Sequence, residues 1–285
     1  MAISALEVKE LREKTGAGMM DCQRALKEAD GNMEEAVKIL RKKGLAAAAK
    51  KAGRTAKDGL VVVAISADAR SGAVAELNCE TDFVARTERY QEFASKIAGQ
   101  ALAEQLGDVA AMLARPFAGD PEHTVEQAIS SEIATIGENI KLSRVGFLGA
   151  RDGMKVGSYL HMGGKIGVLV QLSDGASEET VKDVAMHIAA AEPRFVSRDT
   201  VPAAVVAEER EIAAAQVPPG KPAQVVEKIV DGKVAKFFEQ TCLLEQPFVK
   251  DAELTVGRML EAQGGVKVAA FLRFKLGEGA EAGAE

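Results

Sequence analysis

The sequence predicts an α+β protein in which a small helical bundle precedes a duplicated core of antiparallel strands and helices, with a helical hairpin inserted in the core. Three observations predict this class. Residues 1–54 have helical spacing and their own charge balance, the order strand, strand, helix occurs twice further on, and residues 194–239 have the pattern of two charged helices. At 285 residues the chain is long enough for two or more such units.

The N-terminal module is predicted to be a bundle of three short helices. The first helix begins after Ser4, which can cap it, and ends near Thr15, just before two glycines. Asp21 is expected to cap a second helix that runs through Ala29, and Asn32 is expected to cap a third.

The end of this module coincides with a change in charge. Residues 1–54 hold 12 basic and 8 acidic side chains, whereas the rest of the chain holds 24 basic and 34 acidic ones. The stretch Arg41–Lys57 is rich in Ala and Lys and has few large apolar residues, so we expect it to form a solvated connecting helix.

The core is predicted to consist of two related halves. The first half, residues 55–145, has two strands, two helices and a third strand. Their expected ranges are Leu60–Ser66, Ala73–Cys79, Glu88–Ala103, Thr124–Gly137 and Leu142–Leu148. The second half, residues 146–193 and 240–265, repeats the order strand, strand, helix, which indicates an internal duplication. The expected ranges are Val156–Met162, Lys165–Leu172 and Ser177–Ala191.

Two further units complete the predicted organisation. Residues 194–239 are interpreted as the inserted helical hairpin, broken near residues 218–220 by two prolines and a glycine. A helix over Thr255–Ala262 is followed by residues 266–285, a C-terminal module with one strand and a tail expected to be disordered.

Composition restricts the class of protein. The net charge of −6 argues against nucleic acid as the main partner, since binding a polyanion relies on clustered Lys and Arg. No apolar run approaches the roughly 20 residues that a membrane-spanning helix needs, and residues 1–10 lack the pattern of a leader. The three cysteines lie far apart, without the spacing of a zinc site or a disulfide framework. We therefore expect a cytoplasmic protein that is neither secreted nor bound to a membrane.

The motifs that could carry chemistry are incomplete. Gly163-Gly164-Lys165 is followed by Ile166 and lacks the earlier glycine of a Walker A loop. The glycine-containing run over residues 15–19 has no strand before it, so it is interpreted as a loop rather than a dinucleotide site. Neither metal-ligand spacing nor a neighbouring base accompanies the candidate side chains, which are His123, His161, His187 and Cys79. The sequence predicts no catalytic residue, no cofactor and no metal.

One constellation stands out at the junction of a predicted strand and helix, where the run from Asn78 to Ala85 combines acidic residues with a large aromatic one. On spacing alone, Thr81 or Asp82 caps the next helix and Phe83 turns inward as a hydrophobic staple. The alternative interpretation is that this run contacts a partner.

Two runs resemble the signature motifs of the bacterial elongation factor Ts family: Thr-Gly-Ala-Gly-Met-Met-Asp-Cys at residues 15–22 and Glu-Thr-Asp-Phe-Val-Ala at residues 80–85. The resemblance extends over nearly the whole chain. Its further runs are Ile136-Gly137-Glu138-Asn139, Gly167-Val168-Leu169-Val170, Ala185-Met186-His187 and Gln246-Pro247-Phe248-Val249. It implies an N-terminal module similar to ubiquitin-associated (UBA) domains, a core of two related halves, an inserted hairpin and a short C-terminal module.

The resemblance also implies a function. Members of the family bind the GTPase elongation factor Tu with GDP, promote displacement of Mg²⁺ and release of GDP, and stay bound until GTP binds. Dislocation of the Mg²⁺ ion is assigned by this pattern to Thr81, Asp82, Phe83 and Val84. Further partner contacts are assigned to Met19, Met20, Ile136, Gly137 and His161.

Several alternatives stay open on the sequence. Met19 and Met20 are equally suited to the core of the helical bundle. The position after Cys22 often carries Lys in the family, whereas Gln23 stands here. The hairpin could form a homodimer or a 2:2 complex, bind the GTPase, or do neither.

Two rival functions also remain. An RNA-associated protein would use the basic stretch Arg41–Lys57, although this stretch lacks aromatic stacking partners. A thiol enzyme would depend on Cys79.

Overall fold

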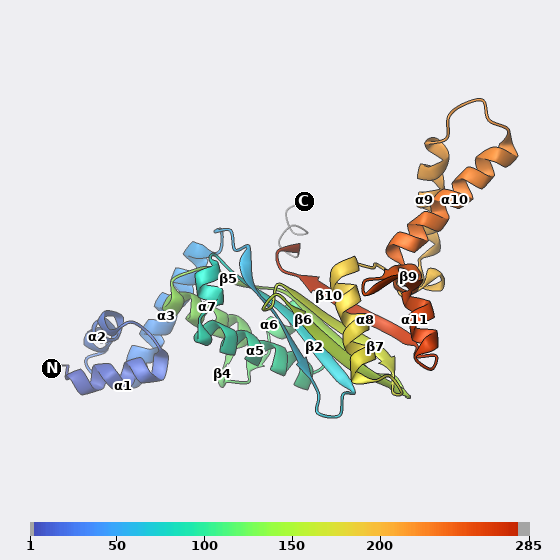
Figure 1. Cartoon of the computed structure of the whole chain (residues 1–285). Helices are drawn as coiled ribbons and strands as arrows, with labels where there is room; N and C mark the ends of the chain where they lie inside the picture. The colour runs from blue at the N-terminus through green and yellow to red at the C-terminus, as the bar shows by residue number, and fades with distance from the viewer. Residues whose placement is uncertain (1–2, 279–285) are drawn as a thin grey trace.

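The computed structural model describes residues 3–278 of the chain. It has the predicted α+β class: a helical module at the N-terminus, a core of small antiparallel sheets covered by helices, and a projecting pair of helices (Figure 1).

The N-terminal module is a bundle of three helices, as predicted. They are α1 (Ala5–Thr15), α2 (Met19–Glu28) and α3 (Met33–Lys51). Ser4 caps α1 in a capping box with Glu7, and the Asn32 side chain accepts a hydrogen bond from the Glu35 N–H at the start of α3. The buried side chains that hold the bundle together are Val8, Leu11, Cys22, Ala25, Leu26 and Ala36.

The predicted cap of the second helix is wrong. Gly18 precedes α2 and offers no side chain, so Asp21 lies within the first turn of the helix and pairs with Arg24. An acidic residue in the first turn interacts favourably with the helix dipole, which gives Asp21 a stabilising position without a capping role.

The predicted solvated connecting helix over Arg41–Lys57 is correct only in part, because most of the stretch is exposed but the helix ends at Lys51 and buries one face. Helix α3 continues without a break through Lys51 and packs against α7 (Val125–Ile136) of the core. Gly44 is buried there, and a Cβ added to it would lie 3.4 Å from the Cβ of Ala134. Small residues allow α3 to approach α7 closely, so one face of the helix is buried without large apolar residues.

The first half of the core is an antiparallel sheet of three strands in the order β1-β2-β5, covered on one face by helices. The strands are β1 (Asp58–Ile65), β2 (Ser71–Cys79) and β5 (Ile140–Gly149), and the largest helix on the sheet is α5 (Glu88–Ala103). Alternation along β2 determines what each face buries, since successive side chains of a strand point to opposite faces. Ala75 and Leu77 pack in the core under α5, whereas Val74 packs between the two sheets.

The second half repeats this arrangement in the order β10-β7-β6. Its elements are β6 (Met154–His161), β7 (Ile166–Ser173), β10 (Val268–Lys275), α8 (Glu178–Ala191) and α11 (Val256–Ala262). In each half the second strand is central and pairs antiparallel with both neighbours.

A two-stranded hairpin that the sequence did not predict occurs once in each half. One joins β3 (Pro116–Phe117) to β4 (Asp120–Thr124), and the other joins β8 (Pro247–Phe248) to β9 (Asp251–Thr255). Their registers match, because proline pairs with threonine and phenylalanine with aspartate in both. The other short elements missed are α4 (Asp82–Ala85), α6 (Val109–Leu113), η1 (Arg198–Thr200) and η2 (Leu243–Glu245).

The two sheets pack face to face, so the core has four layers: helices, sheet, sheet, helices. The side chains fully buried between the sheets are Val61, Val74, Val156 and Leu169.

The structure changes two of the expected boundaries between units of the chain. Strand β5 continues past residue 145, and β10 completes the sheet of the second half instead of forming a separate module. Within the expected tail, Gly277 and Glu278 bond to Glu76 and Arg273, and residues 279–285 lie outside the described part.

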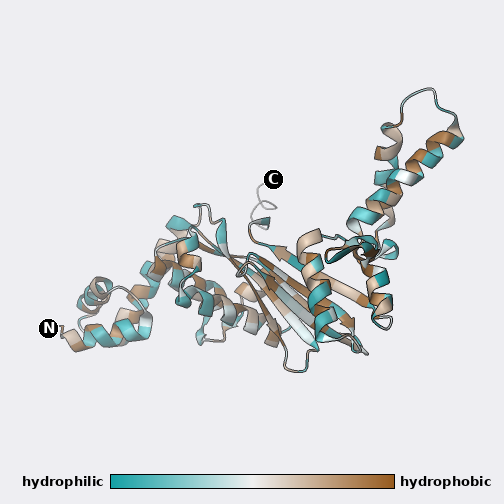
Figure 2. Cartoon of the chain, in the orientation of Figure 1, coloured by the Kyte–Doolittle hydropathy of each residue, from teal (hydrophilic) through white to brown (hydrophobic). Residues whose placement is uncertain are grey.

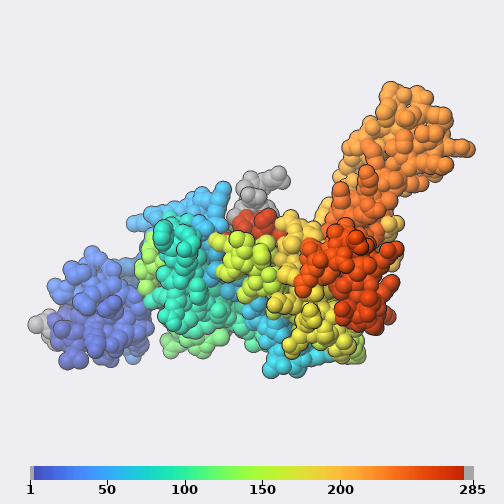
Figure 3. Space-filling view, in the orientation of Figure 1, coloured from blue at the N-terminus to red at the C-terminus, as the bar shows by residue number. Residues whose placement is uncertain are grey.

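The inserted hairpin consists of α9 (Ala203–Ala215) and α10 (Ala223–Thr241). It projects from the core at the end opposite to the N-terminal module (Figure 3). The two helices bury a small core of their own around Ala213, Val230 and Val234, and hydrophilic and hydrophobic residues alternate along both ribbons (Figure 2). Across residues 3–278, no helix combines the length and the apolar character needed to span a bilayer.

Candidate functional site

The candidate site is built on the turn between β2 and α4. Thr81 caps α4, since its hydroxyl oxygen accepts a hydrogen bond from the Val84 N–H at 3.4 Å. The Cys79 thiol donates to the Thr81 carbonyl at 3.1 Å from the end of β2. Both bonds hold the backbone of a helix that is only four residues long.

Phe83 points away from the core. Its side chain is 78% exposed, whereas Val84 packs against the first-half core and Ala85 is buried. Of the two expected caps, Thr81 rather than Asp82 caps a helix, although that helix is the unpredicted α4 and not α5. The expected inward staple is wrong. A large aromatic side chain is thus accessible on the surface of an otherwise packed turn.

Asp82 lies in the first turn of α4 beside Phe83. Its carboxylate accepts a hydrogen bond from the Arg86 guanidinium at 2.6 Å; the Arg86 side chain is largely exposed and that of Asp82 partly so. An exposed ion pair of this kind contributes little to stability, so Asp82 can exchange Arg86 for another cation at small cost.

A second turn lies against the first. Gly137 ends α7 in the left-handed conformation, with φ 91° and open space around the position of a Cβ. Ile136 packs against the first-half core, and the Glu138 carboxylate accepts a hydrogen bond from the Thr81 hydroxyl at 2.7 Å. The structure thus brings the expected contacts at Ile136 and Gly137 next to the Thr81–Val84 run.

His161 ends β6. Its Nδ1 lies 3.1 Å from the hydroxyl of Tyr159, and the turn that follows meets β1, where the Val61 N–H donates to the Gly164 carbonyl at 2.7 Å. Met162, which was expected to end the strand, lies in this turn and is 74% exposed.

Met19 and Met20 open α2 in the N-terminal module, and their side chains are 56% and 67% exposed. They are not part of the core of the bundle, which excludes that alternative. The turn before them lies beside α5, because a Cβ added to Gly16 would meet the Arg89 guanidinium at 3.0 Å.

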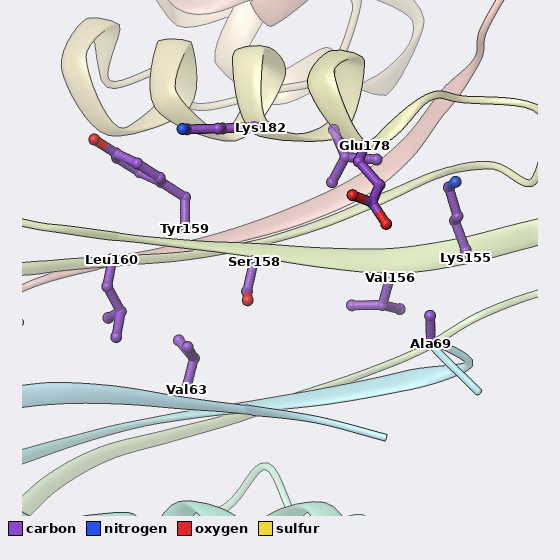
Figure 4. A pocket seen from close by; sticks show the side chains of 10 residues that line it. Val63, Ala69, Lys155, Val156, Ser158, Tyr159, Leu160, Glu178 and Lys182 are labelled. Carbon is purple, nitrogen blue, oxygen red and sulfur yellow. The ribbon is translucent and has the colours of Figure 1, made fainter. Parts of the chain in front are cut away.

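The cavity shown in Figure 4 opens between the edge strands β1 and β6 and has a volume of about 500 Å³. Val63, Ser158 and Leu160 point into it, while Tyr159 lies on the side of α8. Lys155 donates to the Ala176 carbonyl and Glu178 opens α8, so these charged groups have structural roles. The cavity holds no arrangement of acid, base and nucleophile.

The environment of Cys79 does not fit a thiol enzyme. Its side chain is fully buried, and burial raises the pKa of the thiol to about 11. Because the thiolate is the nucleophile, a thiol that stays protonated at neutral pH is unreactive. Among residues 3–278, no cluster of three or more His, Cys, Asp or Glu side chains could hold a metal ion.

The basic stretch Arg41–Lys57 does not fit a nucleic-acid surface well, because three of its seven cations bond within the protein. Lys43 pairs with Glu28 at 2.6 Å, and Arg54 lies 3.5 Å from Glu80. Lys51 Nζ donates to the Ile133 carbonyl at 3.4 Å.

Comparison with known proteins agrees with the motifs. The family model described as elongation factor Ts matches residues 80–278. The chain is 46% identical over 295 residues to elongation factor Ts of Trichlorobacter lovleyi, covering 99% of this chain and 94% of that protein. It is 47% identical over 282 residues to that of Thioalkalivibrio sulfidiphilus, with 99% and 94% covered. It is 45% identical over 293 residues to that of Nitratiruptor sp., with 99% and 95% covered.

Proposed function

Because the chain belongs to the elongation factor Ts family, we propose that its exposed Phe83 is the anchor with which it opens the nucleotide site of elongation factor Tu. The family function itself is nucleotide exchange on elongation factor Tu in translation elongation, and the chain is an exchange factor rather than a catalytic enzyme. The proposal concerns the residues that perform the exchange.

The observation that carries the proposal is the exposure of Phe83 on a turn whose neighbours are fixed. Val84 and Ala85 pack into the core on one side, and on the other side Thr81 caps α4 and donates a hydrogen bond to Glu138. An aromatic side chain held in this way enters an apolar crevice of a partner with little further loss of conformational freedom.

Asp82 gives the same turn a negative charge. A carboxylate inserted near the Mg²⁺ site attracts cationic groups and repels the phosphates, while the aromatic wedge moves the elements that hold the metal. Since Mg²⁺ bridges the protein and the phosphate oxygens, its displacement removes much of the electrostatic attraction that retains GDP.

Exchange also requires a difference in affinity. The factor accelerates release only if it binds the nucleotide-free GTPase more tightly than the GDP form, because a ligand with equal affinity for two states shifts neither. The coupling is reciprocal, so GTP binding weakens the hold of the factor. We therefore propose that the factor stays bound until GTP enters.

The remaining contacts are proposed at positions that the resemblance assigns. The exposed Met19 and Met20 support a contact from the N-terminal module, residues 1–54. Ile136 and Gly137 extend the surface beside Phe83, and His161 adds a contact from the second half of the core. On this proposal the module and the two halves of the core grip the GTPase as separate units.

The test is release of a fluorescent GDP analogue from elongation factor Tu, measured by stopped flow with a catalytic amount of factor. Phe83→Ala is expected to slow release by about thirtyfold, as for a central interface anchor. Asp82→Ala is expected to slow it less if the steric wedge dominates. The reverse order would assign the larger effect to the charge.

A matched control separates a specific anchor from general surface hydrophobicity. Leu254 in β9 is also an exposed large apolar residue, on the second half of the core. Leu254→Ala is expected to leave the release rate within about twofold of the wild type, which is typical of surface positions outside hot spots. Equal losses in the Leu254 and Phe83 variants would contradict the proposed role of Phe83.

We also propose that the hairpin of α9 and α10 associates with a second copy, either in a homodimer or in a 2:2 complex with the GTPase. Ile212 and Val225 support this, because both are exposed apolar residues on an element with a core of its own. Sedimentation velocity of the free factor and of the complex checks it, with Ile212→Glu expected to shift either assembly to a single copy. A wild-type factor that stays single in both measurements would contradict it.

A further inference from the structure

We infer that Glu138 is a positioning residue for nucleotide exchange: its carboxylate fixes the turn that presents Phe83 and joins that turn to the one at Gly137. This inference rests on the proposed role of Phe83. Glu138 stands outside the residues assigned to partner contact, and its part is to hold them in place.

The Glu138 carboxylate accepts three hydrogen bonds from the turn that precedes Phe83. Oε2 accepts the backbone N–H of Glu80 at 3.1 Å and that of Thr81 at 3.0 Å. Oε1 accepts the Thr81 hydroxyl at 2.7 Å. Three hydrogen bonds thus converge on one side chain whose own backbone lies just beyond the end of α7.

These bonds satisfy groups that the sheet leaves unpaired. The ladder between β2 and β5 ends at the pair of Cys79 with Ile140, so the next N–H groups along the chain have no strand opposite them. Buried backbone donors need a partner, and a carboxylate is a stronger acceptor than a neutral oxygen. The Thr81 hydroxyl is oriented by the same contact, since it donates to Glu138 and accepts from the Val84 N–H.

The hydrogen bonding between the two turns is reciprocal. Glu80 Oε1 accepts the backbone N–H of Asn139 at 2.7 Å, so a carboxylate from each turn holds the backbone of the other. The side chain of Asn139 donates to the Arg54 carbonyl at 2.8 Å, and the Arg54 guanidinium lies 3.5 Å from Glu80. The two turns and the segment after α3 therefore form one hydrogen-bonded unit.

The consequence is that Phe83 and Gly137 are presented in a fixed relation. Without Glu138, the turn before α4 would bond to water and sample several conformations, and the GTPase would have to order it during binding. Each ordered group lowers affinity. The loss of hydrogen bonds to a charged acceptor corresponds to a decrease in exchange efficiency of about tenfold for Glu138→Ala.

The experiment is a double-mutant cycle on release of the fluorescent GDP analogue, with the full-length factor and elongation factor Tu. It compares the wild type, Glu138→Ala, Phe83→Ala and the double variant. If Glu138 acts through Phe83, the double variant releases GDP at a rate within about twofold of that of Phe83→Ala alone. The reason is that the effects of substituting two coupled residues are not additive. A double variant slower by the full Glu138→Ala factor would overturn the inference.

Two further variants keep the test valid. Glu138→Gln retains one oxygen for the two N–H groups and is expected to release GDP at a rate between those of the wild type and Glu138→Ala. If Glu138→Ala does not fold, Glu138→Gln takes its place in the cycle. Glu245→Ala removes a carboxylate of similar partial burial that binds Arg198 at the base of the hairpin, and it is expected to exchange normally.

The two proposals fail in different ways. Normal exchange by Glu138→Ala together with slow exchange by Phe83→Ala would reject the positioning role and keep the anchor. Normal exchange by Phe83→Ala would reject the anchor, and the inference about Glu138 with it.

Discussion

Phe83 and Phe93 belong to consecutive helices of the first half and have opposite environments. Phe83 is 78% exposed on α4, whereas Phe93 is 6% exposed in α5, where its ring lies 5.5 Å from that of Phe117. Helix α5 is long enough to have a buried face, and Phe93 falls on it. The four residues of α4 present one side to the core, and Phe83 is on the other.

This contrast predicts opposite effects on stability. Phe83→Ala is expected to change the free energy of unfolding by less than about 0.5 kcal/mol, as for an exposed side chain without partners. Phe93→Ala is expected to lower it by about 3–5 kcal/mol, because it leaves a cavity in the core. Urea unfolding of both variants measures the difference. A large loss in the Phe83 variant would mean that this ring is buried in solution.

Sequence reasoning about the site succeeded where a residue has a local partner. The Thr81 cap follows from a hydroxyl residue just before a helix, and the bond to the Val84 N–H is local. The exposure of Phe83 could not follow from spacing, since a four-residue helix has no periodicity to measure. The role of Glu138 depends on two turns far apart in the chain, which no local pattern relates.

At the scale of elements, the duplication extends to single hydrogen bonds. Gln100 on α5 accepts the Ala118 N–H at 2.9 Å from the β3–β4 hairpin. His187 on α8 accepts the Val249 N–H at 3.3 Å with Nδ1, from the corresponding β8–β9 hairpin. Its Nε2 donates to Gln246 at 3.0 Å, so the neutral ring uses both nitrogens. An amide and a neutral imidazole thus perform the same task in the two halves.

His187→Gln is therefore expected to fold, with stability at pH 7.5 within about 1.5 kcal/mol of the wild type. It should also reduce the acid sensitivity of the protein. Burial lowers the pKa of His187, so below pH 6.5 the unfolded chain takes up a proton that the folded protein does not, and wild-type stability falls. Urea unfolding at pH 7.5 and pH 5.5 compares the two proteins. An equal loss of stability in both would contradict this role of His187.

The elements that the sequence predicted are those with several turns or alternations of pattern, such as α5, α8, β2 and β7. The hairpins β3–β4 and β8–β9 were missed because each contains a strand of only two residues. Helix α3 was divided wrongly because its contact with α7 uses Gly44 and Ala48, which carry almost no hydropathy signal. Close packing between small residues is a property of the pair of helices and is invisible in either one alone.

At the scale of the molecule, a buried ion pair joins the two sheets and the C-terminal end of β10. Glu76 on β2 is fully buried, and Arg144 on β5 donates to it at 2.6 Å. The same guanidinium donates to the Lys275 carbonyl at 2.7 Å and lies 4.3 Å from the centre of the Phe274 ring. The Gly277 N–H donates to Glu76 at 2.8 Å. One carboxylate thus accepts from both halves of the core.

Arg144→Met should consequently destabilise the whole core by about 3–5 kcal/mol, because it leaves a buried carboxylate without its cation. Lys9→Met is the matched control, since Lys9 pairs with Glu13 at 3.7 Å on the open surface of α1, where such a pair contributes under about 1 kcal/mol. Thermal and urea unfolding measure both. Glu76→Gln together with Arg144→Met should recover part of the loss, because no charge is then buried alone. Similar stability of the two single variants would mean that the Glu76 carboxylate is solvated and that the sheets are held together by their apolar faces alone.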